Sequence, residues 1–242
     1  MEKLNLPDNI NKMLEGFVKG LQDIYGDGLI SAALYGSAAS GEYSGAHSNI
    51  NLLVILHDTS MPNIAKASGL MTKHKFRFIH PVFFTEKFIK NSADVFPIEF
   101  LDMKENRVVL YGRDILRDTV IDIKNLRFQC EQELKSKIIN IKNAYLNDNS
   151  RAGREKLLFK FFTSTLHILR NVLRLKGSVP SYAKEDIIND LSREFAGIDD
   201  SVFRRILSAK SNNLKLGAKE IEEMSCSFVA ELEKISDIVD GF

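Results

Sequence analysis

Apolar residues recur at intervals of three and four along the first 25 positions, which predicts an amphipathic helix. This helix should end at the turn Tyr25-Gly26-Asp27-Gly28, which is rich in glycine and aspartate. Two short apolar runs follow, from Leu29 to Tyr35 and from Ile50 to Leu56. Because the second run is apolar at almost every position, it predicts a central strand that is buried on both faces.

Strands and helices continue to mix up to about residue 120. The predicted elements are a surface helix from Met61 to Lys75, a strand from Phe76 to Phe84, a short helical turn from Thr85 to Ile89 that Thr85 caps, a third long strand from Phe96 to Met103, and a strand from Arg107 to Tyr111 that Gly112 ends.

From there on the periodicity is helical throughout. A stripe from Leu126 to Tyr145 predicts one long helix, and an almost uniformly apolar run from Arg154 to Lys176 predicts a helix at the centre of a bundle. Two shorter helices, over 187–195 and 201–210, precede a last one with a stripe from Ile221 to Val239. The sequence therefore predicts an α+β fold, in which a mixed sheet with flanking helices (domain 1–122) is followed by an all-helical bundle (domain 123–242).

The composition is that of an ordinary globular protein, with 44% hydrophobic and 27% charged residues, and it excludes disordered, collagen-like and coiled-coil chains. Its 33 basic and 32 acidic residues leave a formal charge of +1. The chain thus gives no clear signal for nucleic-acid binding, and any site for an anion must be local.

The two cysteines, Cys130 and Cys226, form neither a disulfide framework nor a zinc spacing, so both are expected to be reduced thiols in the core. Charges and Pro7 interrupt the amino terminus, and no stretch approaches 18 apolar residues. We therefore expect no signal peptide and no membrane segment, and a cytoplasmic protein.

One segment, from Leu34 to Ile55, stands out for its chemistry. A predicted strand ends in Gly36-Ser37, small residues begin a helical turn, and the chain returns to a strand at Asn49-Ile50-Asn51. Since Asn49 and Asn51 are two residues apart, their side chains should share one face of that strand. Backbone amides at the start of a helix attract phosphate groups.

The residues from Tyr25 to Val54 resemble the signature of the nucleotidyltransferase superfamily, which includes DNA polymerase beta, kanamycin nucleotidyltransferase and the MNT proteins. In that signature Gly-Ser is followed about ten residues later by Asp-x-Asp on a strand, with a third carboxylate on a neighbouring strand. The resemblance implies that Gly36 and Ser37 bind a nucleotide phosphate. A helix cap is the alternative role for the Ser37 hydroxyl.

Asn49 and Asn51 depart from the family pattern, because they occupy the positions of the two strand aspartates. In the family these carboxylates hold two magnesium ions. The third carboxylate falls most naturally on Glu99, with Asp102 as a second register, so one of the three negative charges is left. We therefore expect metal-dependent transfer to be weak or absent, with Mg²⁺ as a cofactor only if the protein is an active enzyme.

The predicted central helix carries three polar residues whose roles differ from that of its apolar residues. His167 is expected to be a hydrogen-bonded core residue. Arg170 and Arg174 lie one turn apart on an otherwise apolar helix, so they need partners, which are either an anionic ligand or internal carboxylates such as Glu185 and Asp186. A helical domain like that of kanamycin nucleotidyltransferase is the plainest analogy for this half of the chain.

Three functions remain open from the sequence. The leading one is a divergent, catalytically impaired protein that binds a nucleotide or a phosphorylated small molecule in a cleft between the two domains. The second is an active enzyme that transfers a nucleoside monophosphate from an NTP to a small molecule or a protein. The third is a non-catalytic module that forms a homo-oligomer or binds a protein partner through apolar faces of the bundle.

Overall fold

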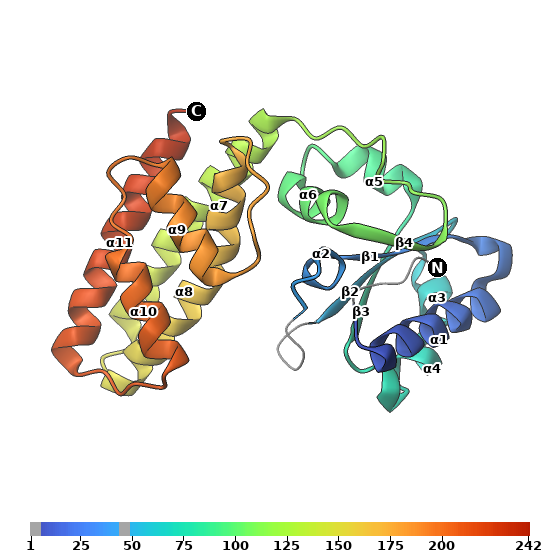
Figure 1. Ribbon diagram of the computed structural model, residues 1–242, viewed down its shortest axis with the longest axis horizontal. Helices are drawn as coiled ribbons and strands as arrows, with labels where there is room; N and C mark the ends of the chain where they lie inside the picture. The colour runs from blue at the N-terminus through green and yellow to red at the C-terminus, as the bar shows by residue number, and fades with distance from the viewer. Residues whose placement is uncertain (1–5, 44–48) are drawn as a thin grey trace. The chain divides into compact units, whose positions relative to one another are not determined.

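The computed structural model of the protein describes residues 6–43 and 49–242 (Figure 1). The chain divides into two units, and the boundary lies between Ile121 and Asp122. Within the described residues, no helix is both long enough and apolar enough to cross a membrane.

A four-stranded mixed sheet organises the first unit. Its strands are β1 (Leu29–Tyr35), β2 (Ile50–Leu56), β3 (Ile79–Phe84) and β4 (Arg107–Gly112), in the spatial order β3-β2-β1-β4. Strand β1 is antiparallel to both β2 and β4, and β2 is parallel to β3. The two central strands are therefore those that the sequence predicts as buried apolar runs.

Helices cover both faces of the sheet (Figure 1). On one face, α1 (Asp8–Tyr25) packs Leu14, Phe17 and Leu21 onto a core that includes every second residue of β2. On the other face, α5 (Glu86–Ser92) and α6 (Pro97–Glu105) contribute to a second core with Leu53 and Ile55. Since both faces of β2 are covered, nearly every position of that strand is apolar.

Residues Pro97–Glu105 form a helix, so the strand predicted from Phe96 to Met103 is wrong. Proline suits the first turn of a helix, because its missing N–H has no partner there and its φ is already helical. Pro97, Phe100 and Met103, three residues apart, are buried on one side of the helix. A proline in the first turn and packing on one face thus favour a helix over the strand predicted for this apolar segment.

The other elements of this unit lie closer to their predicted positions. The surface helix predicted from Met61 to Lys75 is broken into α3 (Met61–Ala65), α4 (Ser68–Met71) and a 3-10 turn, η3 (His74–Phe76). A further 3-10 turn, η1 (Gly26–Gly28), follows α1. The predicted cap of α5 is confirmed, because the hydroxyl of Thr85 accepts a hydrogen bond from the amide of Phe88 at 3.1 Å.

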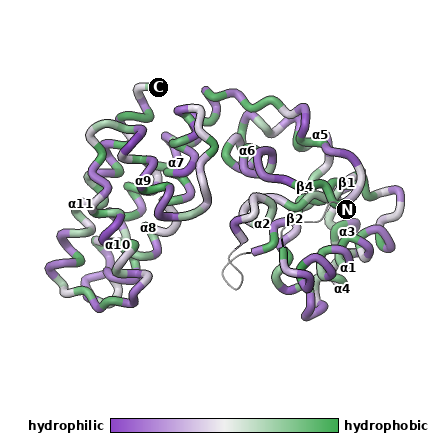
Figure 2. Tube along the Cα trace, viewed as in Figure 1, coloured by the Kyte–Doolittle hydropathy of each residue, from purple (hydrophilic) through white to green (hydrophobic). Residues whose placement is uncertain are grey.

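Five helices make up the second unit: α7 (Ile123–Asn147), α8 (Arg151–Arg174), α9 (Lys184–Glu194), α10 (Ser201–Ser211) and α11 (Ala218–Asp240). They lie at the predicted positions, and hydrophilic and hydrophobic stretches alternate along them (Figure 2). From Thr165 on, α8 is buried at every position but His167, as a central helix should be. Since α7 and α11 both pack on α8, these three helices form the middle of the bundle.

Two predictions about single side chains in this unit are wrong. Cys130 is buried as expected, but Cys226 is exposed on α11. His167 is exposed on α8 and is not a core residue. Each lies next to buried positions of its own helix, and the exact angle of a residue on a helix with several packing partners is not readable from apolar spacing alone.

Candidate functional site

A tight turn follows β1 and leads into the short helix α2 (Ser37–Ser40). Its first residue, Gly36, has φ +76° and ψ −154°, a backbone conformation that is essentially restricted to glycine. The Gly36 amide donates to the Asn106 carbonyl at 3.0 Å, and the Gly36 carbonyl accepts from the amides of Ala39 (2.9 Å) and Ser40 (3.0 Å). Gly36 is therefore held in place both by the residue before β4 and by α2.

The N-cap residue of α2 is Gly36, and no side chain within the described part of the chain caps this helix. The alternative role for the Ser37 hydroxyl, as a helix cap, is therefore wrong. Among the described residues, the backbone amides of Ser37 and Ala38 donate to no backbone carbonyl. Gly41 ends the helix with φ +87°. The turn thus offers two backbone donors and one hydroxyl next to the end of β1.

A polar row crosses the sheet at this end of β1. Asn51 pairs with Tyr35 of β1 on one side and with His80 of β3 on the other, and Tyr35 pairs with Arg107 of β4. Residues that pair across strands project from the same face of a sheet. His80, Asn51, Tyr35 and Arg107 therefore share the face that α5 and α6 cover further along the strands.

Asn51 also lies directly against the tight turn. A methyl group at Gly36 would come within 3.3 Å of Asn51 Nδ2. The side chain of Asn51 is half-buried, and Asn49 is exposed just before β2 begins. The structure thus brings Gly36, Ser37 and Asn51 together, as the sequence motif implies, and Asn49 precedes Asn51 on the same chain segment.

Glu99 does not lie on a strand, because Pro97–Glu105 is the helix α6, and its side chain is exposed. Asp102, the second register, lies on the same helix. The assignment of a third carboxylate to this segment depended on a strand beside β2. That strand is β3, which runs through a different part of the sequence.

His80 is the residue that the sequence analysis missed. It is exposed, and it pairs with Asn51 on the strand that neighbours β2. The sequence predicted a strand over this segment, but neither its parallel pairing with β2 nor its register can be read from apolar runs, because both depend on contacts between distant segments.

The residues of this row do not fit a magnesium site. Magnesium ions in proteins are held mainly by carboxylates and phosphates, whereas Asn49, Asn51 and His80 offer amide and imidazole groups. In the described part of the chain, no group of three His, Cys, Asp or Glu side chains could hold a metal ion. These side chains are therefore better suited to contact a ligand directly than to hold magnesium against it.

At the β4 end of the row, Arg107 forms an ion pair with Asp114. Its Nε and one terminal nitrogen donate to the two carboxylate oxygens at 2.8 and 2.6 Å. A second terminal nitrogen donates to the Lys104 carbonyl. The hydrogen bonds from Arg107 lower the pKa of Asp114 from its usual value, so the positive charge of Arg107 is compensated within the protein.

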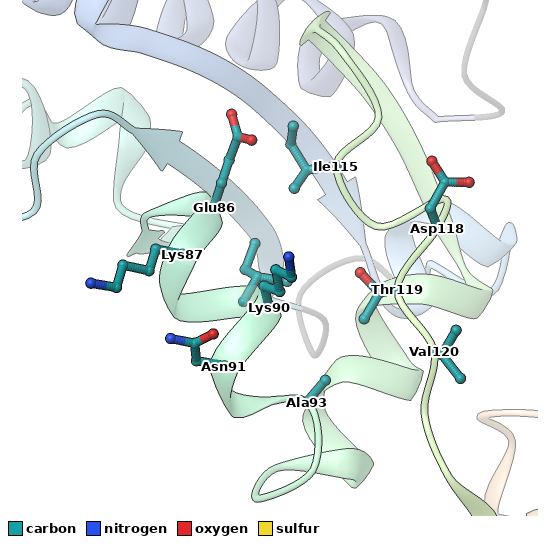
Figure 3. A pocket seen from close by; sticks show the side chains of 10 residues that line it. Glu86, Lys87, Lys90, Asn91, Ala93, Ile115, Asp118, Thr119 and Val120 are labelled. Atoms are coloured by element: carbon teal, nitrogen blue, oxygen red, sulfur yellow. The ribbon is translucent and has the colours of Figure 1, made fainter.

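The first unit also contains a cavity of about 740 Å³ between α5 and the segment 115–120 (Figure 3). Its labelled side chains carry both signs of charge, with Lys87 and Lys90 on α5 and Asp118 opposite. Because α5 follows the carboxyl end of β3, this cavity lies at the opposite end of that strand from His80. It includes neither Gly36, Ser37 nor Asn51.

The two arginines of α8 are built into the bundle. Both are buried; Arg170 Nε donates to the carbonyls of Pro180 (3.2 Å) and Ser181 (3.1 Å), and its guanidinium lies 3.7 Å from the ring centroid of Tyr182. Arg174 donates to the side-chain carbonyl of Asn171. These contacts tie Arg170 to the segment after α8 and Arg174 to a neighbouring turn of the helix.

No model of a protein family matches the sequence, and no curated protein matches it. The structure is similar to spectinomycin adenyltransferase AAD(9) from Enterococcus faecialis, solved with ATP and spectinomycin. The TM-score is 0.58 at 12% sequence identity, and the match covers 95% of this chain and 99% of that chain. The chain has the nucleotidyltransferase fold. This confirms the fold class that the sequence predicts, a mixed sheet of nucleotidyltransferase type followed by a helical domain.

Proposed function

We propose that the protein binds a nucleotide, or another phosphorylated small molecule, at the Gly36–Ser37 turn without magnesium and without catalysing transfer. One observation carries this proposal: in the described part of the chain, none of the four strands contains an aspartate or a glutamate. A nucleotidyltransferase sheet holds its metal ions through strand carboxylates. In this protein the corresponding face presents Asn51 and His80 instead.

The charge balance of the row supports binding without a metal ion. A pair of strand aspartates repels a triphosphate unless magnesium neutralises them, because like charges a few ångströms apart interact strongly in a partly buried site. Asparagines at positions 49 and 51 remove that repulsion, and the amide of Asn51 adds donors. The amides of Ser37 and Ala38 would then meet phosphate oxygens directly.

The similarity to an adenyltransferase solved with ATP and spectinomycin supports a nucleotide as the ligand. The test is the thermal stability of the protein with ATP, GTP, CTP or UTP, each with magnesium and with EDTA. A ligand at 100 times its dissociation constant stabilises the folded state by about 2.7 kcal/mol. We expect at least one nucleotide to raise the melting temperature in EDTA. No shift with any nucleotide, or a shift that requires magnesium, would contradict the proposal.

Variants of the site sharpen this test. Asn49→Asp/Asn51→Asp should bind the same nucleotide more weakly in EDTA than the natural protein does, because two carboxylates return, and magnesium should restore binding. Adding His80→Glu should strengthen this dependence on magnesium if His80 takes the place of the third carboxylate. Ser37→Ala should weaken binding under both conditions.

Release of pyrophosphate from each NTP, with and without spectinomycin as an acceptor, tests the absence of transfer. We expect none from the natural protein with magnesium or manganese. Robust release would show that the protein is an active nucleotidyltransferase.

A further inference from the structure

A basic groove lies on the first unit, outside the turn and the polar row that the proposed function uses. It has a volume of about 470 Å³, and its walls come from the first turns of α1 and from the segment 74–78, which leads into β3. Of the described residues that line it, none is acidic and four are basic: Lys12, His74, Lys75 and Arg77. The groove is therefore a local concentration of positive charge in a chain whose formal charge is only +1.

The cations of the groove are exposed and are not paired with carboxylates. Among the described residues of this unit, Lys12, Lys75 and Arg77 take part in no ion pair. The acids nearest to Lys12 in sequence are Asp8 and Glu15. At 100° per residue, they point about 120–140° away from the middle of the arc of α1 that lines the groove. An anion in the groove would thus meet positive charge that no ion pair neutralises.

An exposed aromatic ring forms part of the same wall. Phe78 is 43% exposed, and the guanidinium of Arg77 lies 4.5 Å from its ring centroid. Arg77 also donates to Nε2 of His74 at 2.6 Å, so two contacts hold the guanidinium in place. The ammonium of Lys75 lies 4.8 Å from the ring centroid of Phe76, which is buried. The wall therefore combines positioned cations with a flat apolar surface.

Cations next to an exposed aromatic ring favour a single-stranded nucleic acid as the occupant. Each nucleotide of a single strand carries one phosphate and one base, and proteins bind such strands with basic grooves that follow the backbone and with aromatic rings on which the bases stack. An acidic peptide or an inorganic polyphosphate would contact the cations but leave the ring of Phe78 without a partner. A double helix presents only the edges of its bases in its grooves, so it offers no base to stack on the ring.

The groove is separate from the proposed nucleotide site but lies at the same end of the sheet. The amide of Ile50, the first residue of β2, donates to the carbonyl of Phe78 at 3.0 Å. The described lining of the groove includes neither Asn51 nor the Gly36–Ser37 turn. Binding in the groove can therefore be measured independently of nucleotide binding.

We propose that this groove binds single-stranded RNA or DNA through its cations and the ring of Phe78. The test is fluorescence polarisation of the full chain with labelled RNA and DNA strands about 12 nucleotides long, with duplex DNA, polyphosphate and polyglutamate as unlabelled competitors. Binding of either strand supports the proposal, and the tighter one identifies the sugar. The affinity should fall about twentyfold between 50 and 200 mM salt, as expected when three phosphates of a single strand are neutralised.

Two results would overturn the proposal. One is the absence of binding to both strands at 50 mM salt and protein concentrations up to about 100 µM, where even non-specific complexes form. The other is competition by duplex DNA, polyphosphate or polyglutamate as effective as that by the unlabelled single strand, because the groove would then recognise negative charge alone.

Removal of the three cations locates the site. The variant that removes them is Lys12→Gln/Lys75→Gln/Arg77→Gln. Its matched control, which removes the same charge from exposed positions of the same unit outside the groove, is Lys66→Gln/Lys87→Gln/Lys90→Gln. The groove variant should bind single strands about a hundredfold or more weakly at 50 mM salt, and the control within about threefold of the natural protein. Circular dichroism and the melting temperature check that both are folded. Equal losses in the two variants would refute the groove.

Phe78→Leu separates stacking from charge. Leucine keeps an apolar side chain in the wall but removes the ring, so binding of single strands should weaken by about fivefold or more while its dependence on salt stays nearly unchanged. Phe88→Leu is the matched control, because Phe88 is 41% exposed and lies on α5, outside the groove. An unchanged affinity of Phe78→Leu, or an equal loss in the control, would refute the role of the ring and with it the choice of a nucleic acid over another polyanion.

Discussion

Replacement of Gly36 by alanine gives a direct test of the turn after β1. Gly36 has φ +76° and ψ −154°, and an added methyl group would lie 3.3 Å from Asn51 Nδ2. Gly41, at the other end of α2, is a matched control, because it also has a positive φ (+87°) but has no atom within 4 Å of an added methyl group among the described residues.

The two substitutions should differ in size. Gly41 is in the left-handed helical region, where alanine costs about 1–2 kcal/mol. Gly36 is in a region that only glycine populates readily, so alanine there should cost about 3 kcal/mol, and the contact with Asn51 adds to this. Gly36→Ala should also displace the Asn51 amide and weaken nucleotide binding, whereas Gly41→Ala should leave binding nearly unchanged.

The assay is urea unfolding followed by far-UV circular dichroism, with the transition of the first unit fitted separately, since two units need not unfold together. Nucleotide affinity is measured on both variants in EDTA. Equal losses of stability for Gly36→Ala and Gly41→Ala, or equal affinities, would refute the argument that the Gly36 conformation positions Asn51.

Three further outcomes follow from buried or paired groups. Asp114→Asn should destabilise the protein by about 1 kcal/mol at pH 7. Because the hydrogen bonds from Arg107 lower the folded-state pKa of Asp114, this stabilisation is present above the unfolded-state pKa and is lost as pH falls through the folded-state pKa, so the difference between the two proteins in urea unfolding should shrink as the solution is acidified. A thiol reagent should modify Cys226 quickly and Cys130 only on unfolding, since burial raises the pKa of Cys130 to about 12. Thr165→Val should raise the free energy of unfolding by up to about 1 kcal/mol, because the Thr165 hydroxyl is buried with no hydrogen-bond partner among the described residues. If urea unfolding shows that the variant is less stable, the hydroxyl of Thr165 has a hydrogen-bond partner after all.

The elements that could be predicted from the sequence are those with a strong local signal. The buried residues of α7 recur every three or four positions, and β2 is apolar at nearly every position. Thr85 marks the start of α5 as its cap. The segment from Phe96 to Met103 is mostly apolar, which suggested a strand, but it also contains a proline suited to a first helical turn. In the structure the segment is a helix, which packs Phe100 and Met103 into the second core.

The site could be predicted only as far as one continuous segment defines it. Gly36, Ser37 and Asn51 lie within sixteen residues of one another, and the motif spacing brings them together. His80 comes from a strand 29 residues after Asn51, and its place beside Asn51 depends on the parallel register of β3 on β2. A one-residue slip of that register would turn a different set of β3 side chains toward the site, and no local pattern fixes it.

The chemistry of Asn51 follows from its contact with Gly36 rather than from the loss of a charge alone. An aspartate has the same shape as asparagine but only acceptor oxygens, so at position 51 it would set a negative charge against the turn that carries the Ser37 and Ala38 amides. Asparagine keeps the shape and the packing beside Gly36 and places a donor there. A phosphate oxygen near these amides would then find donors on both sides, without a metal ion between. Under the proposed function, a sheet whose described strands carry no acidic residue binds a nucleotide through donor groups and without metal ions, so EDTA, rather than magnesium, is the decisive condition for measuring binding.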